Sequence, residues 1–187
     1  MQLSRRRAME LVGGLGVLSL SGCLGGSGEA EDPSSSGNID DIESDGSQWF
    51  AATLEDVRAG ESFRIADFEE PVLIQTFAVW CSTCDEQERQ VDTLRSGDGP
   101  EFAMVSINVD PNEDAEAVRE HATSNGYEWQ WVTPPSAVTE SLADYFGTSV
   151  THPPNAPMIL LCPDGRYKRL ENGIKSPETL TTELETC

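Results

Sequence analysis

The chain has 187 residues, enough for one domain of ordinary size after a leader and a linker, and 37% of them are hydrophobic. Its formal net charge is −21, and Lys168 and Lys175 are its only lysines. This balance argues against nucleic acid as a partner, because phosphate binding needs clustered positive charge. Molar salt shortens the screening length to about 3 Å and removes most of the self-repulsion, so the composition favours a salt-adapted, halophilic protein. The alternative is an acidic mesophilic protein.

Residues 1–22 are typical of an export signal that ends at a lipid-attachment site. Three consecutive arginines precede an apolar stretch that is too short to span a bilayer. The Ser-Arg-Arg sequence before a weakly hydrophobic segment resembles a twin-arginine (Tat) signal, and Leu-Ser-Gly-Cys, ending at Cys23, resembles a lipobox. These resemblances imply cleavage before Cys23 and a lipoprotein anchored to the extracytoplasmic face of the cell membrane. The alternative is an uncleaved anchor.

Residues 23–47 have the composition of a flexible linker. Between Gly25 and Gly46 there are five Gly, five Ser and seven acidic residues, with no basic residue. Such a segment cannot bury enough apolar surface to fold, so it predicts a disordered acidic tether between the membrane anchor and a domain at 48–187.

In residues 48–187, short apolar runs alternate with amphipathic stretches. The patterns predict strands at 62–68, 72–79, 102–109, 129–133, 158–162 and 166–170, and helices at 85–95, 114–124, 136–146 and from Ser176 to the terminus. Pro163-Asp164-Gly165 predicts a hairpin between the last two strands. This order predicts a single α/β domain, a sandwich in which helices flank a central mixed sheet.

Cys81 and Cys84 are spaced by two residues, directly after the buried strand 72–79 and at the start of a helix. Unpaired N–H groups at a helix start favour thiolate over thiol at Cys81. Cys84, one turn later, can close a disulfide with Cys81. The arrangement predicts an exposed attacking thiolate and a covered resolving thiol. Its alternatives are a metal site and a disulfide that only stabilises the chain.

Pro157 stands directly before the apolar strand 158–162. A cis peptide bond between Ala156 and Pro157 would turn the chain and leave backbone groups free to pair with a substrate peptide. The alternative is that Pro157 only delimits a strand in a proline-rich loop.

The segment FAVWCSTC of residues 77–84, Ala156-Pro157 before a strand and the Asp164-Gly165 hairpin together resemble the thioredoxin superfamily, in particular its membrane-tethered TlpA-like branch. The resemblance implies a thioredoxin-like sandwich. It also implies site roles: Cys81 as nucleophile, Cys84 as resolving cysteine, Trp80, Ala156 and Pro157 at the substrate-contact surface, and Pro157 as a cis-proline.

The activity that this resemblance implies is thiol-disulfide exchange through a redox-active disulfide, with no dissociable cofactor. The implied partners are exported proteins that carry cysteine pairs, such as cytochrome c precursors in cytochrome c maturation. A membrane redox partner would reset the pair, because export to the oxidising side requires it for any reductase.

Three features depart from the family pattern. Gln75 occupies the position where thioredoxins place a buried Asp that assists proton transfer to the resolving cysteine, and Gln cannot titrate. Arg89 stands where many relatives have a helix-kinking Pro. The carboxylates of Asp85, Glu86 and Glu88 crowd the active-site helix and oppose thiolate formation.

Cys162 and Cys187 lie at the ends of a predicted strand and of the closing helix. About 11 helical residues at 1.5 Å and five strand residues at 3.3 Å run comparable distances away from Pro157. Both cysteines are therefore expected at the same end of the domain, far from Cys81, where they could form a structural disulfide. The alternative is two free thiols, one of them buried.

The chain has two histidines. His121 lies in an acidic helical stretch and is expected to be a solvated surface residue. His152 lies five residues before Pro157, so Cys81, Cys84 and His152 could bind Cu(I), as in the Sco-type copper chaperones of oxidase assembly, which share the fold. Those relatives space their cysteines by three residues, so no metal is the preferred interpretation.

Overall fold

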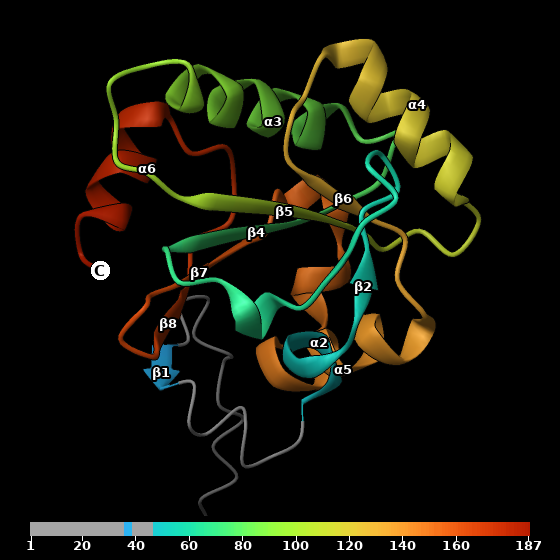
Figure 1. Cartoon of the computed structure of the whole chain (residues 1–187), viewed down its shortest axis with the longest axis horizontal. Coiled ribbons are helices and arrows are strands. Elements are labelled where there is room, and N and C mark those ends of the chain that lie inside the picture. The colour runs from blue at the N-terminus through green and yellow to red at the C-terminus, as the bar shows by residue number, and fades with distance from the viewer. Residues whose placement is uncertain (1–35, 39–46) are drawn as a thin grey trace, which may run out of the picture. The chain divides into compact units, whose positions relative to one another are not determined.

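The computed structural model describes residues 36–38 and 47–187 (Figure 1). The predicted signal and the lipidation site Cys23 lie outside the described residues, as does most of the predicted tether. Three residues of the tether segment form β1 (Ser36–Asn38), which pairs antiparallel with β8 (Arg166–Arg169). Among the described residues, no helix is both long enough and apolar enough to cross a membrane.

A mixed sheet forms the centre of the domain, in the order β1-β8-β7-β4-β5-β6. Its other strands are β4 (Val72–Phe77), β5 (Ala103–Asn108), β6 (Gln130–Val132) and β7 (Met158–Leu161). β4, β5 and β6 are mutually parallel, whereas β7 pairs antiparallel with both β4 and β8. All residues of β4 and β5 are buried, because helices cover both faces of the sheet.

Two layers of helices cover the sheet (Figure 1). One layer holds α3 (Ser82–Arg95), α4 (Ala115–Asn125) and α6 (Pro177–Leu184), and the other holds α2 (Gln48–Ala51) and α5 (Ser136–Phe146). Alternate residues of β4 serve the two layers. Leu73 and Phe77 pack with the α3 side, while Val72 and Ile74 pack with the α5 side. This three-layer α/β architecture confirms the predicted fold class.

Local sequence signals explain where several elements begin and end. Asp114 caps α4, since its Oδ1 accepts from Glu116 N at 3.1 Å and Ala117 N at 2.9 Å. Gly126 ends the helix with a φ of 75°, which glycine adopts without a steric penalty. Ser176 caps α6, and Gly165, with a φ of 88°, turns the hairpin between β7 and β8.

The edge strand predicted at 62–68 is shorter than expected. Only β3 (Ser62–Phe63) is extended, and it pairs with β2 (Leu54–Glu55) in a separate two-stranded sheet. The short 3₁₀ turn η1 (Ile65–Asp67) follows and buries Ile65 against the α5-side core. The alternating apolar residues at 62–68 therefore reflect packing of side chains into the core and not a longer strand.

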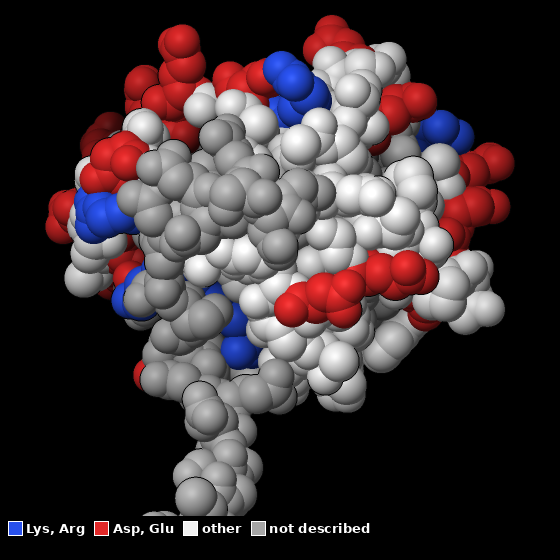
Figure 2. All heavy atoms as spheres, turned by 90° about the horizontal axis from the view of Figure 1, so that it is seen from below, with Lys and Arg blue, Asp and Glu red and all other residues white. Residues whose placement is uncertain are grey.

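Acidic residues dominate the described surface. In the view of Figure 2, Asp and Glu residues, in red, lie mainly along the rim of the visible face and exceed the blue Lys and Arg residues. Several of the basic side chains are paired with acids at short range, for example Arg64 with Asp67 at 2.6 Å.

Candidate active site

Cys81 and Cys84 form a disulfide at the start of α3. Cys81 is the N-cap residue, and its Sγ accepts a hydrogen bond from Cys84 N at 3.2 Å. That contact and the helix start both favour negative charge on Cys81 Sγ once the bond is reduced. Cys81 is 3% exposed and Cys84 is fully buried. The first cysteine is therefore more covered, in this oxidised form, than the sequence predicted.

Trp80 is 61% exposed beside the disulfide, the most exposed large apolar residue in the part of the chain that the structure describes. Its Nε1 donates to Asp110 Oδ2 at 2.5 Å, and Val79 N donates to Glu113 Oε2 at 2.9 Å. The loop after β5 thus holds the segment that precedes Cys81.

Sequence reasoning missed Asp110 and Glu113. A signal was present, because β4 and β5 are parallel and their register places Phe77 opposite Asn108. Residues that follow two parallel strands emerge at the same edge of the sheet, so the polar run after Asn108 had to lie beside the cysteines. The hydrogen bonds from Asn112 and Trp80 hold the pKa of Asp110 below its usual range, which keeps this anchor charged.

Gln75 lies directly beneath the disulfide and is fully buried. Its Nε2 donates to the backbone oxygen of Cys84 at 3.3 Å, while its Oε1 has no hydrogen-bond partner among the described residues. Gln75 therefore positions the first turn of α3. It carries no titratable group, so it cannot accept the proton of Cys84.

The loop before β7 faces Cys84. It consists of the 3₁₀ turns η2 (Thr148–Thr151) and η3 (Pro153–Asn155), and Pro153 O lies 3.2 Å from Cys84 Sγ. The predicted cis-proline is wrong: none of the peptide bonds among the described residues is cis, including that between Ala156 and Pro157. The η3 turn and the left-handed φ of 44° at Ala156 reverse the chain instead.

The backbone groups of Ala156 are also not free, contrary to the expectation for a substrate-pairing loop. Its N–H donates to Pro153 O at 2.8 Å, and its carbonyl oxygen accepts from Lys175 Nζ. Pro157 O accepts from Thr76 N at 3.4 Å. These backbone groups are therefore already hydrogen-bonded within the domain.

Lys175 is a buried cation that sequence reasoning did not single out. It is 6% exposed, and its backbone is clamped by Gln87 of α3, which accepts from Lys175 N at 2.7 Å and donates to Lys175 O at 3.2 Å. Burial, together with the charge of Arg169, lowers the pKa of Lys175 to about 7. One lysine therefore links α3 to the Ala156 carbonyl.

The negative charge of Asp85, Glu86 and Glu88 on α3 is partly neutralised. Arg89 contacts Asp85 Oδ2 at 2.6 Å and Glu86 Oε2 at 2.8 Å, and these bonds lower the pKa of Glu86. Glu88 is fully buried, which raises its pKa. The opposition to a Cys81 thiolate is therefore weaker than the count of acidic residues suggested.

His121 is not the solvated residue that its acidic neighbours predicted. Its side chain is only 9% exposed, its Nε2 lies 2.7 Å from Glu88 Oε2, and its ring stacks on Phe77 at 5.8 Å. Burial lowers the pKa of His121, but the hydrogen bond and charge of Glu88 outweigh it, so that the pKa is raised overall. The helical spacing from Val118 and Ala122, both buried, was the signal that the prediction overlooked.

His152 is exposed and precedes Pro153, whose carbonyl contacts Cys84. Within the described residues, Cys81, Cys84 and His152 are not brought within common reach of one ion, whereas Asp85, Glu88 and His121 are. The disulfide form thus does not assemble the copper set.

Cys162 and Cys187 form a second disulfide, which joins the end of β7 to the end of the chain beyond α6. Both cysteines pack with the α3-side core. Arg166 reinforces the same corner, since its Nη2 donates to Thr186 O at 2.9 Å.

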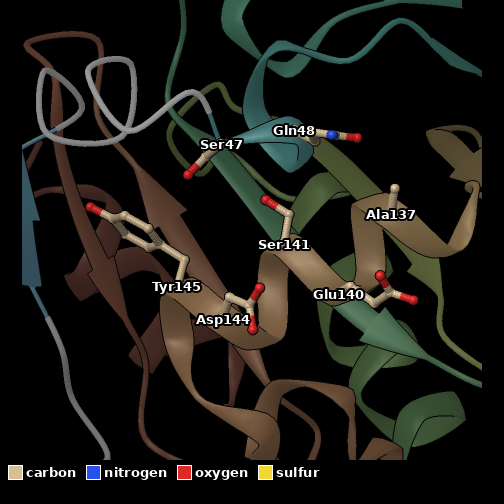
Figure 3. Close-up of a pocket in the computed structure, with 7 residues that line it drawn as sticks. All are labelled: Ser47, Gln48, Ala137, Glu140, Ser141, Asp144 and Tyr145. Atoms are coloured by element: carbon tan, nitrogen blue, oxygen red, sulfur yellow. The ribbon is translucent and has the colours of Figure 1, made fainter.

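A surface pocket of about 330 Å³ lies at α2 and α5, in the helix layer opposite to that of α3 (Figure 3). It is formed by residues of α2 and α5 together with Ser47, namely Ser47, Gln48, Ala137, Glu140, Ser141, Asp144 and Tyr145. None of these residues belongs to the predicted site.

The arrangement of β4, α3, β5, β7, β8 and α6, with Cys-x-x-Cys at the start of α3, is a thioredoxin-like fold. Solved structures with this fold include a secreted disulfide oxidoreductase of Mycobacterium tuberculosis homologous to E. coli DsbE, with a TM-score of 0.59 and 15% identity over 75% of this chain and 98% of that chain.

A DsbF homologue from Corynebacterium diphtheriae aligns with a TM-score of 0.56 and 16% identity, over 73% of this chain and 86% of that one. BsSco, a member of the Sco family of cytochrome c oxidase assembly proteins, aligns with a TM-score of 0.53 and 16% identity. The alignment covers 72% of this chain and 89% of that chain. No family model matches the chain, and no curated protein matches it.

Proposed function

We propose that this protein is a membrane-tethered, extracytoplasmic thiol-disulfide oxidoreductase that exchanges disulfides with exported proteins. The observation that carries the proposal is the Cys81–Cys84 disulfide. Cys81 is the N-cap residue of α3, and the exposed Trp80 precedes it. A disulfide that closes so short a loop restricts the unfolded chain less than a long-range disulfide does, so stability is a weaker reason for its presence.

The exchange proceeds in two displacement steps. Cys81 thiolate attacks one sulfur of a client disulfide, a mixed disulfide forms, and the other client cysteine leaves as a thiolate. Cys84 then loses its proton and attacks Cys81 Sγ, which releases the second client thiolate and closes the Cys81–Cys84 bond. Two electrons pass to the client, and the reverse sequence oxidises a client dithiol.

The surroundings divide the work of these steps. Trp80, held by Asp110, offers an apolar contact surface for the client chain. Gln75 and Pro153 O hold Cys84 in place beneath Cys81. Because Gln75 cannot titrate, the proton of Cys84 passes to water or to the leaving client thiolate.

The tethered, extracytoplasmic location is supported by the sequence alone. The twin-arginine-type signal and the lipobox ending at Cys23 support export and lipid attachment. Globomycin-sensitive processing and labelling of Cys23 by a lipid precursor in whole cells would test this part, with Cys23→Ala as control.

Trapping tests the exchange itself. Cys84→Ser should accumulate clients as mixed disulfides on Cys81, visible as adducts that a reductant removes, whereas Cys81→Ser should accumulate none. Recovery of no adduct from membranes, together with Cys81 alkylation that does not respond to redox poise, would contradict the proposal.

The reduction potential of the Cys81–Cys84 pair then separates reductant, oxidant and inert disulfide. A value above about −300 mV is expected, since structural disulfides fall below that limit. Equilibration of the purified domain with glutathione or dithiothreitol buffers, read by alkylation and mass spectrometry, gives this value.

Copper delivery is the second candidate, supported by the likeness to BsSco and by the position of His152 next to Pro153. It predicts stoichiometric Cu(I) binding by the reduced protein that is lost in His152→Ala. The geometry favours exchange, because the described structure does not bring His152 within common reach of the two cysteines.

A further inference from the structure

A buried pair of titratable side chains lies between α3 and α4, outside the exchange machinery. Glu88 of α3 is fully buried, and His121 of α4 is nearly so, with a 9% exposed side chain. Their nearest atoms, Glu88 Oε2 and His121 Nε2, lie 2.7 Å apart. Among the described residues, neither side chain is hydrogen-bonded to a cysteine or to the loop before β7, so the contacts used in exchange do not account for this pair.

Asp85 completes a set of three possible ligands. One carboxylate oxygen of Asp85, one of Glu88 and a ring nitrogen of His121 all lie within 4.8 Å of one another. Asp85 sits one helical turn before Glu88, and its side chain is 33% exposed, so the set opens to solvent on that side. Its Oδ2 is held by Arg89 at 2.6 Å.

The second observation is an unsatisfied oxygen. Glu88 Oε1 is buried and has no hydrogen-bond partner among the described residues, although the same carboxyl group contacts His121 through Oε2. An unpaired buried acceptor of this kind costs about 1–3 kcal/mol. Buried charged groups are ordinarily paired or coordinate a metal, and the carboxyl group that carries this oxygen belongs to the three-residue set.

Neighbouring rings fix the orientation of the imidazole. His121 stacks on Phe77 and meets the edge of Trp131 at 5.4 Å, so its Nε2 is held toward Glu88. A pre-oriented ring nitrogen and a buried carboxylate reduce the ordering that a bound ion would otherwise require.

We propose that Asp85, Glu88 and His121 form a binding site for a divalent transition-metal ion of the Zn²⁺ class. Two carboxylates and one neutral imidazole supply a charge of −2 and an oxygen-oxygen-nitrogen donor set, which suits Zn²⁺, Co²⁺ or Mn²⁺ and not the soft Cu(I). Three protein ligands leave a further position for water on the solvent side of Asp85. One of the three ligands, Asp85, directly follows Cys84 in the sequence.

The test uses the oxidised full-length protein, in which no cysteine of the Cys81–Cys84 pair is a free ligand. Zn²⁺ is titrated by calorimetry, and Co²⁺ is followed by its visible absorption. One ion per chain is expected, with the affinity weakened by at least about tenfold in Glu88→Gln, His121→Asn and Asp85→Asn.

Matched controls separate this site from surface binding. Glu120→Gln removes an exposed acid next to His121 on the same helix, and His152→Asn removes the other histidine, so both should bind like the wild type. A Cys81→Ser, Cys84→Ser double variant should also retain binding, which makes the outcome independent of whether the protein exchanges disulfides.

Three results would overturn the proposal: no saturable binding by the wild type, unchanged affinity in His121→Asn and Asp85→Asn, or loss of binding in His152→Asn. Asp85 is partly exposed, so Asp85→Asn keeps the test valid if the buried Glu88→Gln variant does not fold. Near-ultraviolet circular dichroism of each variant identifies the folded ones.

Discussion

The two disulfides of this domain differ in almost every physical respect. Cys81–Cys84 spans 3 positions at the start of a helix, whereas Cys162–Cys187 spans 25 and ties a strand to the end of the chain. In the chain-entropy model the longer loop contributes about 3.5 kcal/mol and the shorter about 2 kcal/mol. Of the two, only the first lies beside an exposed aromatic residue, Trp80, and against the loop before β7.

This contrast teaches that surroundings, and not the bond, assign a disulfide its role. The first pair has a helix start that stabilises a thiolate and a neighbouring Trp80 that is open to a partner. The second has core contacts and a hydrogen-bonded corner at Arg166. Variants of each pair, and of the residues around Cys81–Cys84, test this contrast.

The largest expected effect is on activity. Cys81→Ser should reduce exchange with a disulfide substrate to background, because Cys81 is the one cysteine among the described residues that caps a helix. Reduction of a fluorescent disulfide peptide in the presence of dithiothreitol measures it. The Cys162→Ser, Cys187→Ser double variant is the reference and should retain the wild-type rate; a large loss there would mean that the two pairs are functionally coupled.

The largest expected effect on stability comes from the second disulfide. The Cys162→Ser, Cys187→Ser variant should lower the free energy of unfolding by about 3.5 kcal/mol, since it frees a long loop in the unfolded chain. Chemical denaturation at constant salt gives this difference. Cys81→Ser, Cys84→Ser should cost clearly less, and equal costs would remove the structural distinction between the pairs.

The buried Lys175 gives a pH-dependent prediction. Its folded pKa is lowered to about 7, while an unfolded lysine titrates near about 10.4. Between these values the unfolded chain binds more protons, so stability should rise with pH from about 7 to 10, by up to about 1.4 kcal/mol per pH unit. Lys175→Met should flatten this rise, as measured by denaturation at several pH values.

Lys168→Met is the matched control for that prediction. Lys168 is half-buried and paired with Glu183 at 2.7 Å, so Lys168→Met removes a lysine without touching Lys175 and should leave the rise in place. Lys175→Met should also alter the exchange rate, because it releases the Ala156 carbonyl in the loop whose Pro153 carbonyl contacts Cys84, without changing how readily Cys162–Cys187 is reduced. An unaltered pH slope in Lys175→Met would show that Lys175 stays charged in the folded protein.

The smallest expected effect is at Trp80. Asp110→Ala removes the acceptor of its indole N–H and should cost less than about 1 kcal/mol, because the bond is exposed. The indole signal of Trp80 should shift in a ¹H–¹⁵N spectrum, and mixed-disulfide formation should slow modestly. Asp98→Ala, an exposed acid elsewhere, should do neither.

Much of the fold follows from local patterns in the sequence. The central strands 72–77 and 103–108, the helix after Cys81 and the closing hairpin lie where hydrophobic runs, caps and glycine predicted them. The prediction is reliable there because hydrogen bonds within a few residues, and the burial of one apolar run, decide each element.

The site was predictable only in part. Cys81, Cys84 and Trp80 are adjacent in sequence, so their relation needed no tertiary information. The isomer of the Ala156–Pro157 bond was predicted wrongly, because the η3 turn and the left-handed Ala156 reverse the chain without a cis bond. A local motif does not specify which of two turns a loop adopts when the surrounding packing can stabilise either.

The sequence by itself thus determined the order of elements and the placement of a Cys-x-x-Cys pair at a helix start. Only the tertiary structure decided which distant groups meet: Asp110 with Trp80, Lys175 with Ala156, and His121 with Glu88, pairs separated by 19 to 33 residues. The physical reason is that helix caps and strand periodicity depend on neighbouring residues, whereas a buried polar contact depends on how two elements pack against one sheet.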